Sequence, residues 1–154
     1  MFKHLLISAT LTILCAGNVI ASEFGTPEEA DLMLRKAVAE VKADKTQAID
    51  KFNRNDRAFR DRDLYVFCFG TADGRFLAHE HSIGADVRQL RDKYGRMFGQ
   101  EMYDRAKDGA IVAVESASPL PGTTYQMAKT NYVTRIGDDV CGVSVFNKGG
   151  KRFD

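Results

Sequence analysis

The sequence of 154 residues has little net charge, few cysteines and none of the short motifs that mark the commonest enzyme classes. Its 22 basic and 21 acidic residues leave a formal charge of +1, so no overall electrostatic field points to nucleic acid or an anionic membrane. It also lacks a Gly-x-Ser-x-Gly nucleophile elbow and the glycine-rich loops that hold phosphate groups. We therefore expect no catalytic activity, no cofactor and no nucleic-acid partner.

The N-terminal segment has the features of a secretory signal peptide. Met1 to His4 form a short basic start, an apolar run without acidic residues extends from Leu5 to Gly17, and Val19-Ile20-Ala21 precedes Ser22. The apolar run is too short for a stable transmembrane helix. We expect cleavage of residues 1–21, export to the periplasm or the exterior, and no stable membrane span afterwards. Retention as an uncleaved anchor is the alternative.

Cleavage would leave two cysteines. Cys15 would be lost with the signal peptide, and Cys68 and Cys141 would remain. Exported proteins meet oxidising conditions, in which such a pair can form a disulfide. Buried free cysteines are the alternative, because unpaired cysteine is itself among the most buried residue types.

A helical pattern opens the remaining chain. Thr26-Pro27-Glu28-Glu29 combines an N-cap, a proline suited to the first turn and a capping box. Apolar residues follow with helical spacing at positions 30, 34, 37, 38, 41, 48, 49 and 52. The pattern predicts one long amphipathic helix over about residues 27–52, with the charged segment 53–63 as a connector.

Five later segments have the composition of β-strands: residues 64–69, 75–79, 110–115, 127–135 and 140–146. An Asp-Gly step at Asp73 predicts a hairpin turn between the first two strands. Short helices are expected at 86–94 and 98–107, and segment 116–126, with two prolines and a glycine, is expected to be a loop. Hairpin-linked strands with segregated helices indicate an α+β fold with one antiparallel sheet of about five strands and a core over about residues 63–146.

Two histidines, His79 and His81, end the second predicted strand. Residues two apart on a strand share a face, so both could approach one metal ion. A metal site needs a third and fourth ligand, and no spacing in the sequence supplies them. We therefore expect no metal site, with His79 as a polar tip and His81 in a loop.

Aromatic and polar side chains on the predicted strands could enclose a small-ligand pocket. The candidates are Tyr65, Phe67, His79, Lys129 and Tyr132. Lys129 would attract a carboxylate, whose oxygens could accept hydrogen bonds from the histidine and the tyrosines. Alternatively, the aromatic rings fill the core and Lys129 extends into solvent. Lys129 and Tyr132 face opposite sides of a regular strand, so both reach one pocket only if a bulge or bend intervenes.

A series of short motifs resembles the single Cache domain of type 2. In chain order they are Phe59, "DLYVF", "DGRFLAH", "IGADV", Asp92 with Gly95, "FGQEMYDRAKDG", Pro121 with "KTNYV", and "VCGVSVF". The resemblance covers about residues 59–146, and the long preceding helix is also typical of that family. It implies that residues 22–154 form one domain, with a PAS-like antiparallel sheet behind an N-terminal helix. It further implies extracytoplasmic sensing of small molecules, often short organic acids.

The same resemblance implies roles for the candidate residues. Tyr65 and Phe67 match the pocket-facing aromatic strand, His79 matches the histidine that ends the second strand, and Lys129 with Tyr132 matches a Lys-x-x-Tyr step. Two functions remain open: a sensor-type domain that binds a small carboxylate, and a non-catalytic accessory protein that keeps the fold without a working pocket. Either could act through a receptor or another protein partner.

Overall fold

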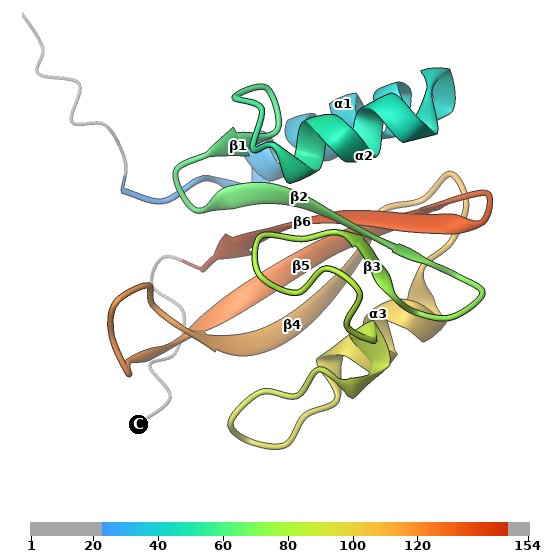
Figure 1. Cartoon of the computed structure of the whole chain (residues 1–154). Helices are drawn as coiled ribbons and strands as arrows, with labels where there is room; N and C mark the ends of the chain where they lie inside the picture. The colour runs from blue at the N-terminus through green and yellow to red at the C-terminus, as the bar shows by residue number, and fades with distance from the viewer. Residues whose placement is uncertain (1–22, 148–154) are drawn as a thin grey trace, which may run out of the picture.

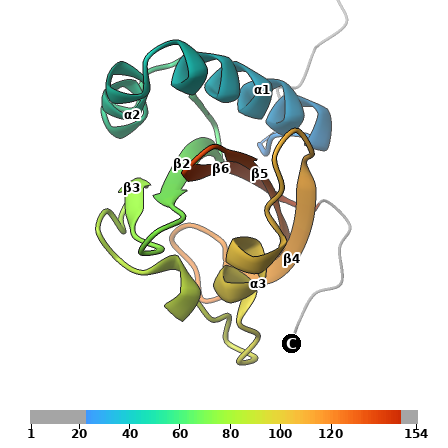
Figure 2. The same ribbon diagram turned by 90° about the vertical axis from the view of Figure 1, so that its right-hand side faces the viewer.

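Residues 23–147, which the computed structural model describes, form an antiparallel sheet with helices on both faces. Figure 1 shows α1 and α2 above the sheet, and the view in Figure 2 places α3 on the opposite side. The predicted α+β class with one antiparallel sheet is confirmed. The predicted signal peptide lies outside the described residues. Within residues 23–147, no helix has both the length and the apolar character needed to cross a membrane.

The predicted long helix is divided into two helices, α1 (Pro27–Ala43) and α2 (Lys45–Asn53). The capping box forms as expected, because the Thr26 side chain accepts from the backbone of Glu29 and the Glu29 carboxylate accepts from the backbone of Thr26. Asp44 causes the break: it is extended, and its side chain caps α2 by accepting from the backbone N–H of Gln47. A single continuous helix was therefore wrong, and α2 turns away from α1 (Figure 2).

The sheet has six strands in the order β1-β2-β6-β5-β4, with β3 also paired to β2. Their bounds are β1 Arg60–Asp61, β2 Leu64–Gly70, β3 Phe76–Ala78, β4 Val112–Pro119, β5 Gln126–Ile136 and β6 Asp139–Phe146. The first long strand and the last strand of the chain are neighbours, so Cys68 lies directly opposite Cys141. The structure joins these two cysteines in a disulfide, with their Cα atoms 4.1 Å apart.

Two boundaries differ from the sequence prediction. β4 continues through the expected loop as far as Pro119, which pairs with Gln126. Proline is tolerated there because β4 is at the edge of the sheet, where a missing N–H interrupts no further ladder. The first expected short helix is only a 3₁₀ turn, Val87–Gln89, which Asp86 caps, whereas α3 (Phe98–Arg105) forms close to its predicted place.

Strand alternation gives the sheet two different faces. On β2, the side chains of Leu64, Val66 and Cys68 pack toward α1 and α2 in one apolar core. The alternating side chains of Phe67 and Phe69 pack on the opposite face, with Met102 of α3. The second face is less completely filled, and the candidate site lies there.

Candidate functional site

A cavity of about 180 Å³ lies between the second face of the sheet and the chain that covers it. One part of its wall is apolar and is formed by Phe67, Phe76, Leu90, Phe98 and Met102. The other part carries the polar or amphipathic side chains Tyr65, His79, Ser82, Ser118, Lys129, Asn131 and Ser144. The lining therefore suits a small ligand that has one polar end and one apolar end.

Strand pairing determines which residues share the cavity wall. Lys129 and Asn131 are two apart on β5 and therefore point to the same face, and Asn131 pairs with Ser144 of β6. Phe67 of β2 pairs with Gly142 of β6. A Cβ atom at position 142 would lie 2.4 Å from the ring of Phe67, so only glycine leaves room for this ring to lie across β6.

Lys129 provides an ammonium group that has no counter-ion among the described residues. Its Nζ lies 4.9 Å from the ring centroid of Phe146 and 5.7 Å from that of Tyr65, and no ion pair within residues 23–147 involves it. Burial lowers the pKa of Lys129, and the carboxylates of Asp63 and Glu80 oppose this shift only by longer-range attraction. A partly desolvated cation between aromatic rings is a site that an anion can complete.

His79 presents a neutral ring beside this cation. Burial lowers the pKa of His79 to about 4, and the positive charges of Lys129 and His81 lower it further. Its Nδ1 accepts a hydrogen bond of 3.1 Å from the backbone N–H of His81, so the neutral ring carries its proton on Nε2. The ring packs 4.5 Å from that of Phe76. His79 can therefore donate one hydrogen bond near Lys129.

His81 itself is exposed and does not line the cavity. Its side chain extends toward Glu80 at 3.6 Å instead. Among the described residues, no cluster of three or more histidine, cysteine or acidic side chains is arranged to hold a metal ion.

Tyr132 lies on the other face of the sheet. Its side chain packs against the core beneath α1, close to Pro27 and Leu32. The pairing of β5 with β6 is regular from Lys129 to Ile136, so no bulge brings Tyr132 round to the side of Lys129. Four of the five candidate pocket residues thus line one cavity and Tyr132 does not, as strand parity indicates.

Two functional candidates, Asn131 and Ser144, were missed by the sequence reasoning. The amide nitrogen of Asn131 donates to the carbonyl oxygen of Val114 and to the hydroxyl of Ser116, each at 3.0 Å. The hydroxyl of Ser144 donates to Oδ1 of Asn131 at 2.6 Å. The available signal for Asn131 was its parity, because it shares a face of β5 with Lys129, whereas Ser144 could be identified only from the pairing of β6 with β5.

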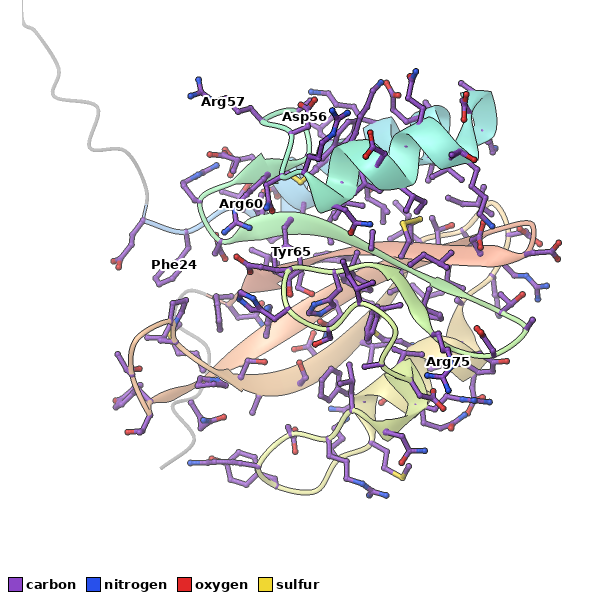
Figure 3. The ribbon with its side chains drawn as sticks, in the orientation of Figure 1. Phe24, Asp56, Arg57, Arg60, Tyr65 and Arg75 are labelled. Carbon is purple, nitrogen blue, oxygen red and sulfur yellow. A yellow bond between two sulfur atoms is a disulfide. The ribbon has the colours of Figure 1, made fainter. Side chains whose placement is uncertain are left out.

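An outer cleft leads to the same lysine. It shares Tyr65, Ser118 and Lys129 with the inner cavity. Arg60 and Glu80 line the cleft and form an ion pair with each other. Figure 3 shows Arg60 beside Tyr65 where β2 begins. Lys129 is therefore placed between the cavity and the outside.

An antiparallel sheet in this order, with α1 and α2 on one face and a ligand-sized cavity beneath α3 on the other, is a PAS-like fold. Comparison of the sequence with known family models and with curated proteins gives no match. Solved structures do match. One is a methyl-accepting chemotaxis protein from Vibrio parahaemolyticus RIMD 2210633, with a TM-score of 0.60 and 17% identity over 77% of this chain and 86% of that one.

Two further solved structures give the same result. The periplasmic sensor domain of a chemotaxis protein matches with a TM-score of 0.56 and 23% identity, over 79% of this chain and 90% of that one. A Cache chemosensory domain, described for its recognition of carboxylic acid, matches with a TM-score of 0.55 and 17% identity, over 79% and 88% of the two chains. The chain has the fold of a single Cache-like sensor domain, as its motifs predicted.

Proposed function

We propose that this protein is an exported, non-catalytic sensor-type domain that binds a small carboxylate in the cavity beside Lys129. The observation that carries the proposal is the partly buried ammonium of Lys129, which has no counter-ion among residues 23–147. Bringing a carboxylate to this group would complete an ion pair in a place where water screens it poorly. The similar Cache domain that recognises carboxylic acid supports the same ligand class.

The remaining cavity wall has a role in this proposal. Nε2 of neutral His79 donates a hydrogen bond to one carboxylate oxygen, and the aromatic ring of Tyr65 holds the ammonium of Lys129 in place. The apolar side chains of Phe67, Phe76 and Met102 accommodate the carbon skeleton of the ligand. Each group binds or orients the ligand, and the proposal assigns no chemical step to any of them.

We also propose that the protein acts outside the cytoplasm. It rests on the signal-peptide pattern of residues 1–21 and on the periplasmic sensor domain whose fold the chain shares. A receptor or another protein partner would distinguish the ligand-bound form of the protein from the ligand-free form.

A thermal-shift screen of residues 22–154 with small organic acids tests the ligand class. We expect at least one small carboxylate to raise the melting temperature of the wild-type protein, and we expect Lys129→Met to remove most of that shift. Lys42→Met is the matched control, because Lys42 is exposed at the end of α1, away from the cavity. Absence of stabilisation by every acid would favour an accessory protein without a working pocket.

A further inference from the structure

The hydrogen-bond directions at the floor of the cavity are fixed by one carbonyl group. The side-chain nitrogen of Asn131 lies 3.0 Å from the backbone oxygen of Val114, which can only accept a hydrogen bond. The amide of Asn131 must therefore turn its nitrogen toward Val114 and its oxygen toward Ser144. Both hydrogens of the amide nitrogen are used, one by Val114 and one by the hydroxyl of Ser116.

Ser144 is constrained in turn. The side-chain oxygen of Asn131 can only accept, so the hydroxyl of Ser144, 2.6 Å away, must donate its single hydrogen to it. Only lone pairs remain on the hydroxyl oxygen of Ser144 and on Oδ1 of Asn131, and no other donor within the described part of the chain reaches them. Both residues line the cavity and each is 4% exposed. This part of the wall accepts hydrogen bonds and donates none.

The carboxylate-binding part of the wall has the opposite character. Lys129 donates, and neutral His79 donates through Nε2. Lys129 and Asn131 are two residues apart on β5, so their Cα atoms are separated by about 6.6 Å along the strand. Donors and acceptors therefore face the same cavity within the length of a small molecule.

We propose that the cavity selects a small hydroxycarboxylate. Its carboxylate would bind Lys129 and His79, and its hydroxyl would donate to Ser144 or to the side-chain oxygen of Asn131. The inference rests on the proposed carboxylate-binding function and adds the substrate class. A keto oxygen at the same position would face the lone pairs of Ser144 and Asn131 and be repelled by them, and an unsubstituted acid would make no hydrogen bond to either residue.

The size of the cavity agrees with an acid of three or four carbons. A volume of about 180 Å³ has room for about six water-sized groups. The methyl or ethyl end of such an acid would contact the apolar wall formed by Phe67, Phe76 and Met102.

Calorimetric titration with lactate, pyruvate and propionate tests the inference, because these acids share a skeleton and differ only at the second carbon. Both enantiomers of lactate are titrated. We expect one enantiomer to bind residues 22–154 at least roughly tenfold more tightly than pyruvate and propionate, since only lactate supplies a donor. Pyruvate or propionate binding as tightly as lactate would overturn the inference and leave the proposed function intact.

The variant Asn131→Leu tests the direction of the Ser144 hydroxyl. Without Asn131, the hydrogen of Ser144 can turn toward the ligand and donate to a keto oxygen, so the preference for lactate over pyruvate should largely disappear. Thr134→Val is the matched control: it removes a buried hydroxyl from the opposite face of β5, where Thr134 bonds to the backbone of Lys107, and should keep the preference.

The wild-type ranking decides the inference even if Asn131→Leu does not fold. An Asn131→Leu protein that folds and retains the full preference would also overturn it, because the fixed Ser144 hydroxyl would not be its cause. If none of the three acids binds, the inference is wrong, and the wider carboxylate screen then decides the proposed function separately.

Discussion

Replacement of Lys129 by methionine should weaken carboxylate binding strongly without harming the unliganded protein. A hydrogen bond to a charged group is worth about 1.5–3 kcal/mol, which corresponds to roughly ten- to a hundred-fold in affinity. Methionine keeps an unbranched apolar stem beside the rings of Tyr65 and Phe146, so the packing of these rings should change little.

The stability of the unliganded variant follows from the sign of the pKa shift. The pKa of Lys129 is lower in the folded protein than its ordinary value, so folding disfavours the ammonium form. This penalty is fully present below the folded pKa and disappears as the pH rises through the unfolded pKa. Near neutral pH, Lys129→Met removes the penalty, and the free energy of unfolding should be equal to that of the wild type or higher.

Two assays check this reasoning. Calorimetric titration with an acid that binds the wild type measures the loss of affinity in Lys129→Met, with Lys42→Met as the exposed-lysine control. Urea denaturation without ligand measures stability. Equal affinities would remove Lys129 from the site. A Lys129→Met protein destabilised by more than about 1 kcal/mol without ligand would show that the lysine has a structural role instead.

Other predictions concern the disulfide, His79, Tyr132 and export. Thiol titration of unfolded, unreduced protein should find no free thiol, and reduction should lower stability by about 4 kcal/mol because the Cys68–Cys141 bond spans 73 residues; two free thiols would refute the bond. The pKa of His79 falls from 6.5 to about 4 on folding, so the free energy of unfolding should decrease as the pH drops from 6.5 to about 4. The expected decrease is ~1–2 kcal/mol, because solvent screens the half-buried ring. His79→Gln should remove that component and the exposed control His81→Gln should not; identical pH profiles for wild type and His79→Gln would contradict it. Tyr132→Phe should leave ligand affinity unchanged, since Tyr132 packs beneath α1, and a loss of roughly tenfold would contradict the placement. Mass spectrometry of the exported protein should find a chain that begins at or near Ser22, whereas an intact chain in the membrane would refute cleavage.

The sequence predicted those parts of the fold that depend on neighbouring residues. The capping box at Thr26 and the hairpin after β2 are local patterns, and both are found in the structure. The break at Asp44 is also local, but it was missed because the apolar spacing on both sides fits one helix. Asp44 breaks the helix there because no large apolar side chain between Val41 and Ala48 packs this turn against the sheet.

The remaining features of the fold and of the site could be predicted only if the order of the strands in the sheet was known. Pro119 can continue β4 only because β4 is an edge strand, and its position in the chain does not reveal that. The same holds for the site: Lys129 and His79 stand out as candidates by residue type, whereas Ser144 becomes a candidate only once β6 is known to pair with β5. Tyr132 illustrates the reverse error, since the Lys-x-x-Tyr step of the family resemblance suggested a pocket residue that strand parity places on the other face.

The location of the bound carboxylate tests the central claim most directly. Two-dimensional NMR of isotopically labelled residues 22–154, titrated with an acid found by the screen, would map the binding site through shifts of backbone amide signals. The account predicts the largest shifts at His79, Lys129, Asn131 and Ser144, and none of comparable size in Lys129→Met. Shifts concentrated elsewhere, for example around Leu32 on the outer surface of α1, would contradict it.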